Sequence, residues 1–94
     1  MELKIPKNFQ IFGKTIKVTQ PYKVDKEDSR GEWSYNKATI KVKRSLPIDE
    51  KESVFLHELT HCLLDMLEYN ELSHNEQLVE TFSRALHQAI KTMK

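Results

Sequence analysis

The first half of the chain alternates apolar and polar residues, a pattern typical of strands that bury one face. In the segment 11–18 the alternation runs from Lys14 onward, and Gly13 predicts a turn or a bulge just before it. The same half contains further expected elements: a strand at 32–35, a strand at 39–43, and a loop over 19–32 with a short strand at 22–24. We therefore expect a small antiparallel sheet.

From residue 49 onward, apolar residues recur at the spacing of helices that bury one side. Asp49, with Glu52 three residues later, forms a capping box and predicts a helix that ends near Glu68. A second capping box, Ser73 with Glu76, predicts the start of another helix. Because the connection is short, the two helices are expected to pack antiparallel. The apolar stripe of the second helix comprises Leu78, Val79, Phe82, Leu86, Ala89, Ile90 and Met93.

Together these elements predict an α+β fold, in which a small antiparallel sheet packs on a two-helix hairpin. The length of 94 residues indicates a single domain, 1–94, with a modest core. Its one cysteine, Cys62, excludes a disulfide within the chain and is expected to be a buried thiol. The N-terminus lacks the apolar run of a signal peptide, and no segment is apolar enough to span a membrane. We therefore expect a cytoplasmic protein with no membrane partner.

Charge divides unevenly between the two halves. Residues 1–47 carry eleven Lys and Arg against five Asp and Glu, whereas residues 48–94 carry four against nine. A basic half can attract nucleic acid. However, the basic residues are not interleaved with aromatic ones as they are in many nucleic-acid-binding surfaces. The favoured interpretation is lysines on the solvent-facing side of strands and glutamates on helix surfaces, without a nucleic-acid partner.

The sequence His57-Glu58-Leu59-Thr60-His61 lies inside the first predicted helix. Residues four apart stand on the same face of a helix, so both imidazoles can reach one tetrahedral zinc ion at about 2.0–2.1 Å. Glu58 lies about 100° round the helix from His57. It would stand beside the metal without being a ligand, as a general base. Two histidines on a solvated helix face are the alternative interpretation.

A catalytic zinc ion needs a third protein ligand and an open fourth position. Glu76 already has a role as the capping partner of Ser73, which counts against it as a ligand. Glu80 lies one turn deeper in its helix, and its competing role is an ion pair with Arg84, which contributes little. Glu80 is therefore the preferred third ligand and Glu76 the next. The remaining candidates are His74 and His87.

Three residues near the motif have two interpretations each. Asp65, one turn beyond His61, either orients a ligand imidazole or is a solvated helix residue. Trp33 and Tyr35 are expected in the core, with the lining of a substrate groove as the alternative.

At these residues the chain resembles the zincins, and more narrowly the minimal phage- and prophage-type metallopeptidases, which are similar to the gluzincins and to the ImmA/IrrE group. The resemblance covers roughly residues 31–92 and is carried by the histidine motif and the segment 76–83. It implies a zincin-like fold, with Glu80, nineteen residues past His61, as the third ligand. It also implies that a peptide substrate adds a strand to the sheet edge at 39–43. The candidate oxyanion stabilisers are Tyr69 and His74.

The favoured function is a zinc-dependent metalloendopeptidase of narrow specificity, which hydrolyses a peptide or one specific protein with a zinc-activated water. Two other classes stay open. One is a non-catalytic module that zinc stabilises and that binds a partner protein. The other is a DNA-associated protease of the SprT type, although the chain lacks the zinc ribbon that often accompanies that class.

Overall fold

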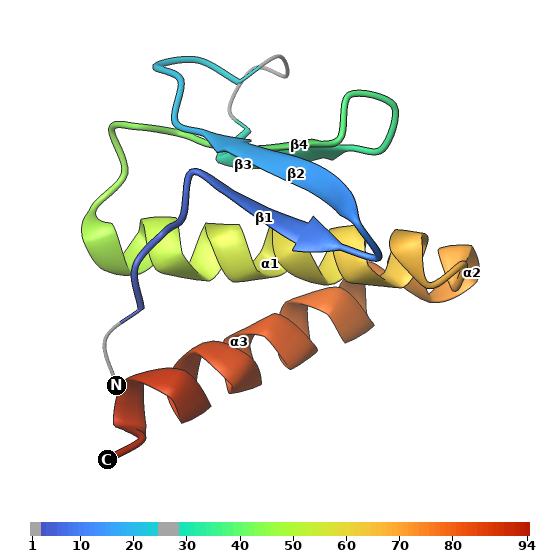
Figure 1. Cartoon of the computed structure of the whole chain (residues 1–94). Coiled ribbons are helices and arrows are strands. Elements are labelled where there is room, and N and C mark those ends of the chain that lie inside the picture. The colour runs from blue at the N-terminus through green and yellow to red at the C-terminus, as the bar shows by residue number, and fades with distance from the viewer. Residues whose placement is uncertain (1–2, 25–28) are drawn as a thin grey trace.

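The computed structural model describes residues 3–24 and 29–94 (Figure 1). Within these residues it confirms the α+β class. The expected strand at 22–24 is wrong, since these residues form no strand. None of the described helices is long and apolar enough to cross a membrane. The elements are β1 (Asn8–Ile11), β2 (Lys14–Thr19), β3 (Gly31–Ser34), β4 (Thr39–Val42), α1 (Ile48–Met66), α2 (Asn70–Ser73) and α3 (Glu76–Thr92).

The four strands form one mixed sheet in the order β1-β2-β4-β3. β1 pairs antiparallel with β2, and β3 with β4, but β2 and β4 run parallel, with Val18 opposite Ile40. The prediction of an all-antiparallel sheet is therefore wrong at one pair. The order has a physical reason, because β4 brings two fully buried residues, Ile40 and Val42, to the interior of the sheet. β3 is left at the edge, so the expected substrate edge at 39–43 is also wrong.

The core lies between the sheet and α1, and α3 covers the opposite side of α1 (Figure 1). α1 is thus covered on two sides, which agrees with the apolar residues spread around it. Cys62 is fully buried, as expected, and burial, with Asp65 nearby, raises the pKa of its thiol to about 12. The buried core residues are Ile16, Val18, Ile40, Val42, Phe55, Leu56 and Cys62.

The first predicted capping box does not form. α1 starts after Pro47 without a side-chain cap, and Glu52 is only 2% exposed. Its carboxylate lies 3.0 Å from Nε2 of His87 and accepts from Nζ of Lys91 at 3.2 Å. The side chain of Glu52 therefore ties α1 to the far end of α3. Two partners of this kind on a buried carboxylate stabilise the fold more than the same side chain would as an exposed helix cap.

The second capping box is also wrong, and this changes the site. Ser73 ends a short helix, α2, that the sequence pattern did not reveal. The residue that caps α3 is Asn75, whose Oδ1 accepts from the backbone N–H of Leu78 at 3.1 Å. Glu76 is consequently the first residue of α3 and not the capping partner of Ser73. Its side chain is free of that role.

Candidate metal centre

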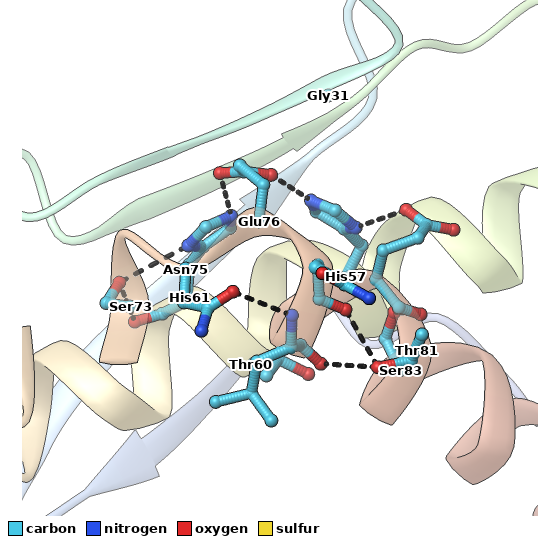
Figure 2. Close-up of polar contacts among 12 residues, drawn as sticks. Gly31, His57, Thr60, His61, Ser73, Asn75, Glu76, Thr81 and Ser83 are labelled. Carbon is cyan, nitrogen blue, oxygen red and sulfur yellow. Dashed lines mark hydrogen bonds and ion pairs between the residues drawn. The ribbon is translucent and has the colours of Figure 1, made fainter. Parts of the chain in front are cut away.

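The two histidines of the motif lie side by side on α1, facing the start of α3 (Figure 2). Their ring centroids are 5.1 Å apart, and both side chains are largely shielded, with His57 20% and His61 15% exposed. Burial lowers the pKa of His61 and is the largest of several influences on that pKa. A lowered pKa favours the neutral imidazole, which is the form that binds a metal.

Glu76 places its carboxylate against both imidazoles (Figure 2). One oxygen lies 3.5 Å from Nε2 of His57, and the other lies 3.2 Å from Nε2 of His61. Ligands at about 2.0–2.1 Å from a tetrahedral zinc ion are separated from one another by about 3.3–3.4 Å. Each distance is close to the length of one such edge, and the two contacts use different oxygens of the carboxylate. These three residues form a group whose ligand atoms all lie within 4.8 Å of one another.

A partner on the far side of each imidazole fixes which nitrogen faces Glu76. Nδ1 of His61 lies 3.2 Å from Oγ of Ser73, whose hydroxyl donates to the backbone carbonyl of His61 at 3.4 Å. Nδ1 of His57 lies 3.0 Å from Oε2 of Glu80. When each Nδ1–H donates outward, each Nε2 has a lone pair directed towards the carboxylate of Glu76. The two Nε2 atoms and the carboxylate would then be acceptors that face one another, an arrangement that a shared cation stabilises. These three groups therefore fit zinc as ligands.

The sequence favoured Glu80 over Glu76 as the third ligand, whereas the structure groups Glu76 with both histidines. Glu76 contacts Nε2 of both histidines, whereas Glu80 contacts only Nδ1 of His57, on the outer side of that ring. A carboxylate behind a ligand histidine orients it and makes it more basic. The sequence argument against Glu76 was that it pairs with Ser73 in a capping box. In the structure Asn75 caps α3 instead, so this argument no longer applies.

Glu58 lies between the histidine pair and the sheet. Burial raises its pKa to about 7; the negative charges of Glu76 and Glu32 act in the same direction, and His57 opposes them. Gly31 of β3 permits this arrangement. A Cβ there would come 2.5 Å from Cγ1 of Val54, 2.9 Å from the carbonyl oxygen of Lys41 and 3.3 Å from Cγ of Glu58. The missing side chain allows β3 to lie directly over α1.

Asp65 has neither of the roles expected for it. Its Oδ2 accepts a hydrogen bond of 2.9 Å from Nε1 of Trp33, so it joins the end of α1 to the edge strand. Trp33 packs against the core, as expected, and also lines the hollow beside the histidines. Tyr35 was expected in the core, and this is wrong because it is 53% exposed.

The other candidates lie elsewhere. His87 contacts Glu52, away from the motif, and is not part of the metal group. His74 is exposed but lines the same hollow as both motif histidines, whereas Tyr69, 57% exposed, lines neither hollow at the motif.

Two adjoining hollows of about 400 and 550 Å³ open over the histidine motif. Both are lined by Ser29, Gly31, His57 and Glu58, so they form one cleft between the edge strand and the two long helices. One hollow continues past Arg30 and Glu50, and the other continues past Trp33 and Asp65. A cleft that extends on both sides of the histidine pair suits an extended chain better than a compact ligand.

Ser73 is the site residue that sequence reasoning missed. It was assigned to a cap, yet it is 2% exposed and bound to His61. The available signal was Asn75, an equally good capping residue; taking it as the cap would have released both Ser73 and Glu76 for the site.

No protein-family profile, curated protein or solved structure matches this chain, so the assignment of the site stands on its geometry.

Proposed function

We propose that this protein is a zinc-dependent peptidase in which His57, His61 and Glu76 hold the metal and Glu58 is the general base. One observation carries the proposal. The carboxylate of Glu76 lies 3.5 and 3.2 Å from the two Nε2 atoms, in a cleft whose wall includes the half-buried Glu58. A zinc site made only for stability is usually closed by four protein ligands, whereas a catalytic site has three and an open position. The three-residue group supports the catalytic reading.

The chemistry follows from what each residue does. Zinc held by the three ligands would polarise the scissile carbonyl and acidify a water molecule. Glu58 stands beside the ligand pair and takes the proton of the attacking water on its carboxylate. It then delivers that proton to the nitrogen of the leaving amine. The outer partners, Glu80 and Ser73, hold the imidazoles in place so that this geometry is present before substrate arrives.

The substrate that suits the cleft is an extended polypeptide. β3 is the edge strand of the sheet and contributes Gly31, Glu32 and Trp33 to the cleft wall. An edge strand offers backbone groups to which a peptide can pair as an added strand. Because the hollows continue on both sides of His57 and Glu58, residues before and after the scissile bond would both be bound.

The test compares Glu58→Gln with wild-type protein for zinc content and for cleavage of a denatured-protein mixture, followed by mass spectrometry of new termini. We expect one equivalent of zinc in both proteins and cleavage by the wild type alone, with a loss of at least about 10²-fold in the variant. Glu71→Gln, an exposed acid on α2, is the matched control and should cleave normally. Zinc binding without cleavage by any variant or the wild type would instead identify a non-catalytic, zinc-stabilised binding module.

A further inference from the structure

The side-chain polar contacts that join α1 to α3 lie at two places in the described part of the chain. One is the candidate metal centre. The other, which we call the Glu52 clamp, consists of Glu52 on α1 with His87 and Lys91 on α3. Nζ of Lys91 lies 3.2 Å from both carboxylate oxygens of Glu52, and Nε2 of His87 lies 3.0 Å from one of them. The clamp is separate from the metal centre, because Glu52 precedes His57 by five residues, about 7.5 Å along α1.

The two candidate third ligands are themselves about one helical turn apart. Glu76 faces Nε2 of both motif histidines, whereas Glu80, four residues later, faces the outer nitrogen of His57. If α3 slid along α1 by one turn, towards the C-terminal end of α1, Glu80 would come close to the present place of Glu76. The register of α3 along α1 therefore decides which carboxylate lies between the two imidazoles.

We propose that the Glu52 clamp fixes this register and thereby positions Glu76 as the third ligand, an inference that rests on the proposed zinc site. The apolar contacts of α3 discriminate less between registers. Leu86 and Ile90 both pack against the core and are also four residues apart, so a one-turn slide replaces one aliphatic side chain by another. A hydrogen bond is more selective, because it weakens steeply with distance and angle.

His87 opposes the slide in two ways. The slide would carry its Nε2 about 5 Å away from the carboxylate of Glu52. It would also bring the imidazole close to the place of Ser83, four residues earlier, which is only 1% exposed and has a much smaller side chain. His87 and Glu52 are therefore the two residues of the clamp that distinguish one register from the other.

The clamp is better suited to selecting a register than to adding stability. The side chain of Glu52 is 3% exposed, so its charge has lost most of its hydration, which offsets much of the attraction to Lys91. Apolar residues in place of such a buried ionic group often leave stability unchanged or higher. What they lose is the requirement for one particular alignment of the two helices.

The double variant Glu52→Leu/His87→Ala separates these two roles. It removes both residues that distinguish the registers, and it leaves the exposed end of Lys91 free to reach water. Asp49→Leu/Gln88→Ala is the matched control, since it places the same two side chains at exposed positions of the same helices. Both variants should unfold in urea close to the wild type.

Zinc affinity, measured by competition with a chromophoric chelator, is the first readout. Glu52→Leu/His87→Ala should bind zinc at least about 10-fold more weakly than the wild type, as expected when a ligand is no longer held in place. The control should bind like the wild type. In the double variant, adding Glu80→Gln should weaken binding by a larger factor than it does in the wild type, because Glu80 then shares the role of ligand. Unchanged affinity, or an equal factor in both proteins, overturns the proposal.

A distance measurement tests the register without any metal. Spin labels on Leu67→Cys and Gln88→Cys, both at exposed positions, would lie roughly 22 Å apart along α1, and a one-turn slide shortens this separation by about 5 Å. Cys62 is fully buried and stays unlabelled. The wild type and the control should give one distance, and Glu52→Leu/His87→Ala should add a shorter one. A single unchanged distance in that variant overturns the proposal, even if its zinc affinity falls. A wild type that binds no zinc would contradict the proposed function, and the distances would still decide whether the clamp sets the register.

Discussion

Oγ of Ser73 lies 3.2 Å from Nδ1 of His61, on the side of the ring away from Glu76. When Nδ1–H donates to this oxygen, Nε2 is left free for a metal. We expect Ser73→Ala to weaken zinc binding about 10- to 100-fold, since loss of an outer partner has that effect in other zinc sites. Competition with a chromophoric chelator measures the affinity. Ser45→Ala, at an exposed serine away from the cleft, is the control and should bind zinc like the wild type. Equal affinities in all three proteins would remove Ser73 from the site.

Glu76 and Glu80 face different imidazole nitrogens, so their substitution should reduce zinc affinity to different extents. Glu76→Gln removes a ligand and should abolish binding of one equivalent of zinc at micromolar concentrations. Glu80→Gln keeps a hydrogen-bond acceptor for Nδ1 of His57 and should weaken binding about 10- to 100-fold. Isothermal titration of the two variants gives the comparison. The reverse order of losses would return the role of third ligand to Glu80.

Gly31 is expected to be required for cleavage more than for metal binding. A Cβ at this position meets Val54 and the backbone oxygen of Lys41, so Gly31→Ala must displace β3 from α1. Displacement should cost about 1–3 kcal/mol of unfolding free energy. It should also reduce cleavage strongly, because β3 forms the cleft wall beside Glu58. Zinc affinity should change little, since no ligand lies on β3.

Gly13→Ala is the control for Gly31→Ala. Gly13 has a φ of +81° and open space around its Cα, so an added methyl group strains only the backbone. It should cost about 1 kcal/mol, as measured by urea unfolding, and leave cleavage unchanged. If Gly31→Ala behaves like this control, the close approach of β3 has no part in function.

Stability should fall in acid because of Glu52. Its pKa is lowered from 4.5 in the folded protein, mainly by the hydrogen bond with His87, against the opposing effect of burial. A lowered pKa means that the unfolded chain binds the proton more tightly. The stabilisation is therefore fully present above pH 4.5 and is lost as the pH falls through the folded-state value. Glu52→Gln should cost about 1–3 kcal/mol near neutral pH and progressively less in acid. A difference from the wild type that does not change with pH would contradict this role for Glu52.

The sequence predicted what depends on neighbours along the chain. The strands β2, β3 and β4, the turn at Gly13, the extent of α1 and the one-turn spacing of His57 and His61 all follow from local periodicity, and the structure agrees with them. The strand β1 was not predicted. The order of the strands depends on long-range pairing. Nothing in the local pattern says that β4 inserts between β2 and β3, so the parallel pair was not predictable and the wrong strand was placed at the edge.

The wrong cap predicted for α3 has a different origin, since two local signals competed within three residues. Ser73 and Asn75 are both good capping residues, and only tertiary packing decides between them. His61 binds Ser73 and thereby leaves the cap to Asn75, which moves Glu76 into the first turn of α3. Glu52 is a similar case. Its position three residues after Asp49 matched a cap, but His87 and Lys91, from a distant part of the chain, determine its place.

The ligand set His57, His61 and Glu76 is the central claim, and zinc K-edge X-ray absorption tests it most directly. Protein loaded with one equivalent of zinc should show four nitrogen or oxygen neighbours at about 2.0–2.1 Å, with the outer scattering of two imidazoles and none from sulfur. The two-imidazole signal should persist in Glu58→Gln, and Glu76→Gln should retain no stoichiometric zinc to give a spectrum. A sulfur neighbour, a single imidazole, or an unchanged spectrum in Glu76→Gln would contradict the assignment.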